Sequence, residues 1–219
     1  YDGSQIPFDK PQALRYFGYG KGADVPADAE IVFDECAKEA QAACAYRVCY
    51  AEFPIKTEGN TLDLGFTKTT SAALAKNLQG CEKVIAFAAT VGIGVDRLIS
   101  RYEKVSPFKA YAFQAIGAER VESLCDTFNG EITKTYEAEG LYTRPRFSCG
   151  YGDFPLEKQR DFFAALDCQR KIGLTLNDSC LMSPSKSVTA LIGIGKTPRK
   201  TSAEKCEACE NREHCSFKK

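Results

Sequence analysis

The chain has 219 residues, of which 44% are hydrophobic and 26% charged, values that are ordinary for a globular protein with a buried core. Its 29 acidic and 29 basic residues give a net charge of zero, which argues against binding nucleic acid through a basic surface. The sequence shows no run of eighteen apolar residues and no N-terminal signal pattern, so we expect neither a membrane span nor export.

Hydrophobic periodicity predicts a mixture of helices and strands. In the first helix, at 28–46, Asp28 is the expected cap and Ile31 falls on the apolar stripe. Continuous apolar runs of strand length, such as 83–89, predict buried strands. In chain order, helices are expected at 28–46, 69–78, 94–103, 107–138 and 155–169, and strands at 48–55, 83–89, 173–176 and 187–195.

The order of these elements indicates the fold class. Strands do not alternate one-for-one with helices, which disfavours a doubly wound parallel sheet. Pairs of helices between strands favour an α+β fold with a mostly antiparallel sheet and helices packed around it. After Gly195 the composition shifts to Lys, Arg, Thr, Glu and Cys. We therefore expect one folded unit over residues 1–195 and a cysteine-rich tail over 196–219.

Two short runs carry most of the functional information. Residues 146–155 read RFSCGYGDFP, which combines an arginine suited to a carboxylate, two glycines and a tyrosine. Residues 181–190 read LMSPSKSVTA and lead into a predicted strand. The first run also fits an ordinary turn. Because both runs are irregular and lie beside predicted helices and strands, we expect them to line one concave face.

A third run, VGIGVD at 91–96, follows an apolar strand and opens a helix, as a dinucleotide-binding turn does. The third glycine of that motif is missing, because position 97 is Arg. A tight strand–helix turn is the simpler interpretation.

Eleven cysteines are an odd and high number. With no signal pattern, reduced thiols and a cytoplasmic location are expected. Most of the cysteines in apolar or helical surroundings are expected to act as small buried hydrophobic residues: Cys36, Cys44, Cys49, Cys125 and Cys168.

The tail contains a candidate metal site. Cys206 and Cys209 form a Cys-x-x-Cys pair, and Cys215 follows five residues later. Such spacing suits zinc or an iron–sulfur cluster, with His214 or Cys149 as a fourth ligand. Free thiols or a disulfide are the alternatives. His214 is the chain's only histidine, which argues against a Ser-His or Cys-His hydrolase in the core.

The two informative runs, taken together, resemble the activation (reactivation) domain of cobalamin-dependent methionine synthase in its stand-alone form. Further similar runs lie at 14–19, 88–92 and 115–122, so the resemblance covers roughly 8–195. That family has an antiparallel sheet with helices packed around it. The residues that match its pattern, in order, are Arg146, Gly150, Tyr151, Met182, Pro184, Ser187 and Val188.

The resemblance implies an S-adenosylmethionine-binding subunit that supports reductive methylation of cob(II)alamin. It implies that Arg146 pairs with the carboxylate of S-adenosylmethionine, that Glu122 meets its positive charge, and that Tyr151 faces the ligand or the corrin. Gly150 and Ser187 complete the implied site. Cobalamin would come from a partner, either a cobalamin-binding methionine synthase or a related corrinoid protein, with an electron donor such as a flavodoxin.

The sequence departs from the fused members of the family at its end. Those domains continue after the Ser-Val strand with a segment that carries tandem tyrosines at the ligand, whereas residues 197–200 here read TPRK. A second hypothesis therefore stays open, a non-catalytic corrinoid-protein adaptor with a metal- or iron–sulfur-bearing cysteine tail.

Overall fold

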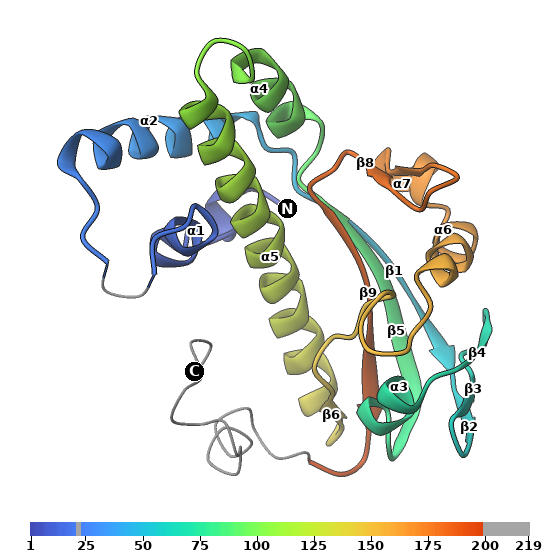
Figure 1. Cartoon of the computed structure of the whole chain (residues 1–219). Coiled ribbons are helices and arrows are strands. Elements are labelled where there is room, and N and C mark those ends of the chain that lie inside the picture. The colour runs from blue at the N-terminus through green and yellow to red at the C-terminus, as the bar shows by residue number, and fades with distance from the viewer. Residues whose placement is uncertain (21–22, 199–219) are drawn as a thin grey trace.

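The computed structural model of the chain describes residues 1–20 and 23–198 (Figure 1). Its helices are η1 (Gly3–Gln5), α1 (Lys10–Tyr16), α2 (Ala27–Ala43), α3 (Ala72–Asn77), α4 (Gly94–Tyr102), α5 (Pro107–Glu137), η2 (Leu156–Lys158), α6 (Gln159–Leu166) and α7 (Cys168–Ile172). Its strands are β1 (Arg47–Pro54), β2 (Lys56–Glu58), β3 (Thr61–Asp63), β4 (Lys68–Thr70), β5 (Cys81–Thr90), β6 (Tyr142–Thr143), β7 (Thr175–Leu176), β8 (Met182–Ser183) and β9 (Ser187–Gly195).

The main sheet has four strands in the order β1-β5-β9-β6, and every neighbouring pair is antiparallel. Two small antiparallel sheets, β2-β3-β4 and β7-β8, lie outside it. The predicted α+β class with a mostly antiparallel sheet is confirmed. Strand β5 is central because β1 and β9 pair with its two sides. It is buried from Val84 to Thr90, as its continuous apolar run predicts.

Helices cover both faces of this sheet (Figure 1). Alternate residues of β5 point to opposite faces, as the period of a strand requires. On one face Ile85 and Phe87 share a core with Leu124 and Phe128 of α5. On the other face, Val84, Ala86 and Ala88 share a core with residues of α6 and α7, among them Phe162, Leu166 and Cys168.

Some predicted elements differ from the structure in their ends. Helix α2 begins at Ala27 after Pro26, so Asp28 lies in its first turn and is not the cap, and Ile31 is 62% exposed. The helix expected at 155–169 is divided into η2, α6 and α7. Asp167 separates the last two in a left-handed conformation with φ of 53°, which short polar side chains tolerate.

The glycines at 91–96 have a packing explanation. Gly92 has a φ of +79°, which favours glycine. A Cβ on Gly94 would lie 2.0 Å from the carbonyl oxygen of Ala43, at the end of α2. Gly94 therefore allows the start of α4 to approach the end of α2. This packing fits the simpler interpretation of the run, a tight strand–helix turn.

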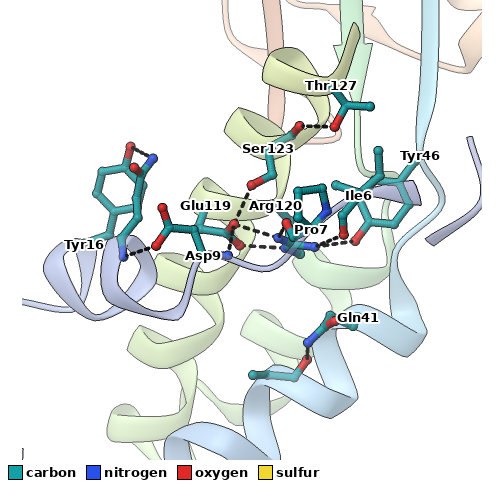
Figure 2. A network of polar contacts seen from close by, with 12 residues as sticks. Ile6, Pro7, Asp9, Tyr16, Gln41, Tyr46, Glu119, Arg120, Ser123 and Thr127 are labelled. Atoms are coloured by element: carbon teal, nitrogen blue, oxygen red, sulfur yellow. Dashed lines mark hydrogen bonds and ion pairs between the residues drawn. The ribbon is translucent and has the colours of Figure 1, made fainter. Parts of the chain in front are cut away.

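A buried ion pair fixes the N-terminal segment to α5 (Figure 2). Glu119 and Arg120 are 0% and 1% exposed, and Arg120 Nε lies 2.6 Å from Glu119 Oε2. The Arg120 guanidinium also donates to the carbonyl oxygens of Ile6, at 3.2 Å, and Pro7. Glu119 Oε1 accepts the backbone N–H of Asp9 at 3.0 Å. Because the side chain of Asp9 caps α1, this pair also sets where α1 begins.

None of the helices in the described ranges has the length and apolar character that crossing a bilayer would require.

Candidate functional site

A cavity of about 420 Å³ lies between α5, the loop after β6 and the start of β9. This volume is within the usual range for small-molecule sites. The two runs expected to share a concave face both contribute to it. The residues that line the cavity are Glu122, Arg146, Phe147, Ser148, Cys149, Tyr151, Gln159, Met182, Ser187, Val188 and Thr189.

The sheet holds the arginine end of the loop in place. Phe147 forms a β-bridge with Leu191 of β9. The backbone N–H of each residue donates to the carbonyl oxygen of the other at 2.9 Å. The side chain of Asn77 donates to the carbonyl oxygen of Pro145 at 3.2 Å. Arg146 lies between these two attachments, so its position is set by β9 and α3.

The glycine end of the loop is held by a turn and a cap. Gly150 has a φ of +87°, and its N–H donates to the carbonyl oxygen of Phe154 at 2.8 Å. The carboxylate of Asp153 accepts the N–H groups of Ala72 at 2.7 Å and Ala73 at 3.0 Å, at the start of α3. Between these anchors Tyr151 is 67% exposed at the edge of the cavity. Gly150 shapes the turn and is not among the lining residues.

Arg146 joins two carboxylates of α5. Its Nη2 lies 2.5 Å from Glu122 Oε2, and its Nη1 contacts Asp126 Oδ1. Burial alone would lower the pKa of Arg146, but the hydrogen bond to Asp126 and the nearby charges outweigh it and raise the pKa. The guanidinium is therefore permanently charged, and the three side chains together carry a net charge of −1.

Ser187 is at the first position of β9 and lines the cavity. Its hydroxyl lies 2.8 Å from both Thr90 Oγ1 and the carbonyl oxygen of Pro184. These contacts connect β9 to β5 and to the Ser-Pro turn, so the Ser187 hydroxyl supports the cavity wall.

A family model described as vitamin B12 dependent methionine synthase, activation domain, matches residues 70–214. The chain belongs to this family. The resemblance noted in the sequence is thereby confirmed. No curated protein matches the chain.

A solved structure shares the fold of this activation-domain protein. It is titled as the crystal structure of the MetH reactivation domain bound to AdoHcy, and the two chains align with a TM-score of 0.63. Sequence identity is 15%, and the match covers 97% of this chain and 79% of the other. The antiparallel sheet with its covering helices is thus the fold of a methionine synthase reactivation domain.

The sequence did not reveal every residue at this candidate site. Asp126 contacts Arg146 from one helical turn beyond Glu122, and the i, i+4 spacing of the two acids on α5 was the available signal. Gln159 and Thr189, which are both buried, also line the cavity. Gln159 was missed because a polar residue at the start of a helix normally faces water.

The cysteines of the described ranges give no metal centre. Within those ranges no three His, Cys, Asp or Glu side chains are grouped so as to hold a metal ion. Cys149 lines the cavity, and burial raises the pKa of its thiol to about 12. The tail residues Cys206, Cys209, His214 and Cys215 lie outside the described residues. Of the cysteines expected to be buried, Cys44 is partly exposed and the others are buried: Cys36, Cys49, Cys125 and Cys168.

Proposed function

We propose that this chain is an S-adenosylmethionine-binding reactivation subunit that supports reductive methylation of cob(II)alamin in a partner methionine synthase. The observation that carries the proposal is the position of Arg146 and Glu122 on one cavity of ligand size, with Tyr151 exposed at its edge. The solved reactivation domain of the same fold was crystallised with AdoHcy, which differs from S-adenosylmethionine by the transferred methyl group.

The charges of the site suit this ligand. S-adenosylmethionine carries a carboxylate, an ammonium and a sulfonium, so its net charge is +1. The cluster of Arg146, Glu122 and Asp126 carries −1. On binding, the ligand carboxylate would accept hydrogen bonds from the Arg146 guanidinium in place of Glu122. The Glu122 carboxylate would then accept hydrogen bonds from the ligand's ammonium. Ion pairs are exchanged, and the charges of the ligand and the cluster sum to zero.

The protein's contribution is position and electrostatic field. The bound methyl donor and the partner's cobalt supply the chemistry. Glu122 and Arg146 would fix the amino-acid part of the donor, and the open edge at Tyr151 would admit the corrin of a docked partner. Gly150 and Ser187 would support the walls. A cobalamin-binding methionine synthase or a related corrinoid protein is the proposed partner, and a flavodoxin-like protein the proposed electron donor.

A cytoplasmic location is part of this proposal. The cobalt of the partner must be reduced, and the chain contains eleven cysteines. Both favour a reducing compartment.

Reactivation of a partner tests the proposal directly. The chain is mixed with an oxidised, inactive cobalamin-dependent synthase that lacks its own activation domain, together with reductant and S-adenosylmethionine. We expect methionine formation to recover, and to stay absent when either the chain or S-adenosylmethionine is omitted. Methionine production over time is the measurement.

The matched control for this assay is a fused activation domain added under the same conditions. If that domain restores turnover and this chain does not, the proposal that the chain reactivates a methionine synthase is wrong. Calorimetry with S-adenosylmethionine on anaerobically prepared protein then separates two explanations. Absence of binding would favour the adaptor function, whereas binding without reactivation would indicate a different corrinoid partner.

A further inference from the structure

Gln159 is an unusual residue for its position in α6. Together with Phe162 and Leu166 it lies on one face of the helix, at i, i+3 and i+7. That face packs into the core, and Gln159 is 6% exposed. An apolar side chain is the normal occupant of such a position. The glutamine instead lines the cavity.

The amide of Gln159 is only half satisfied. Its Nε2 lies 3.4 Å from Thr189 Oγ1, which is a long hydrogen bond. Its Oε1 is buried and has no hydrogen-bond partner among the described residues. Exchanging the positions of the amide oxygen and nitrogen does not change this. The Thr189 hydroxyl can donate or accept, so it would then pair with the oxygen and leave the nitrogen without a partner. A buried polar group without a partner costs free energy, so its presence beside a cavity requires an explanation.

We infer that Gln159 hydrogen-bonds the nucleoside part of the ligand and is left half-satisfied when the site is empty. This inference rests on the proposed function. Arg146 and Glu122 already match the charged amino-acid part from the α5 side of the cavity. The neutral polar side chains Gln159 and Thr189 come from α6 and β9. An amide offers one donor end and one acceptor end, which suits the hydroxyls of a ribose or the ring nitrogens and amino group of an adenine.

The test compares the wild type with Gln159→Met, which keeps the length of the side chain and removes the amide. Two probes are titrated by calorimetry or competition: S-adenosylmethionine, and methylthioadenosine, which has the nucleoside without the amino acid. We expect the affinity for both probes to fall by about 3- to 10-fold, the effect of one neutral hydrogen bond. Arg146→Ala should weaken only S-adenosylmethionine.

Thermal melting of the ligand-free protein provides a second measurement. Because the amide is poorly paired in the empty site, Gln159→Met should leave the melting temperature unchanged or raise it. Thr69→Val is the matched control. Thr69 Oγ1 is also buried without a partner within the described part of the chain, but it lies in β4 and does not line the cavity. That variant should bind both probes as the wild type does.

Each other outcome has a distinct meaning. If the wild type binds both probes and Gln159→Met binds each of them as tightly as the wild type does, Gln159 is not a ligand contact. A loss confined to S-adenosylmethionine would move Gln159 to the amino-acid part and overturn the nucleoside assignment. A lower melting temperature of the empty variant would indicate a structural role. A wild type that binds neither probe would overturn the proposed function, and this inference with it.

Discussion

Replacing Glu119 with alanine is expected to lower the free energy of unfolding by about 3–5 kcal/mol, the usual cost of removing one partner of a buried ion pair. Arg120 is 1% exposed, so its guanidinium would keep its charge in the interior without the carboxylate that now contacts it. The change also removes the acceptor for the backbone N–H of Asp9. Chemical denaturation followed by circular dichroism gives the measurement.

Two further variants show whether burial is the cause. Glu82→Ala removes the carboxylate from an exposed pair with Lys196, whose side chains are 62% and 69% exposed, and should cost at most about 1 kcal/mol. Replacing Glu119 and Arg120 together by leucines should cost less than Glu119→Ala alone, because no charge stays buried. Equal losses for Glu119→Ala and Glu82→Ala would contradict this account of the buried pair.

Arg146→Ala is expected to weaken S-adenosylmethionine binding by about 1.5–3 kcal/mol, roughly 10- to 150-fold, the scale of a hydrogen bond to a charged group. The fold should survive, because Glu122 and Asp126 are exposed enough to be hydrated when their partner is removed. Calorimetry on the wild type and the variant measures the difference, and thermal melting checks that the variant is folded.

Conservative and distant replacements sharpen this test. Arg146→Lys keeps the charge but loses the planar fork, so an intermediate loss is expected. Arg160→Ala removes an exposed arginine that donates to the carbonyl oxygen of Asp178 and does not line the cavity, so affinity should not change. If Arg146→Ala binds as tightly as a wild type that itself binds, Arg146 is not part of the site.

The elements predicted well are those with long hydrophobic patterns. The strand expected at 83–89 lies within β5, and the helix expected at 107–138 is α5, which ends at Glu137. The strand expected at 173–176 contains β7. Strands β6 and β8 also have only two residues each, too few to show a period, and they were not predicted. They depend on partners elsewhere in the chain, as β6 does on β9. A sequence read locally contains no signal for such pairing.

The candidate site, too, could be predicted from the sequence only in part. The order of Arg146 and Tyr151 in a family pattern identified the loop, and the structure places that loop beside Glu122. The carboxylate pairing of Arg146 follows from α5 passing beside the loop, which no spacing in the sequence shows. Gln159 could not be predicted for another reason: the sequence shows that the residue is polar but not that it is buried. Burial appears only when α6 is packed against the sheet.

The place of β1 in the sheet limits how the chain can be shortened. The family match begins at residue 70, but β1 forms the outer neighbour of β5 from Arg47 to Pro54. A protein expressed from residue 70 onward would leave one side of β5 with unpaired backbone groups along a strongly apolar strand. Such an edge invites pairing between molecules, so aggregation of that fragment would follow from the missing strand and would give no information on its ligand.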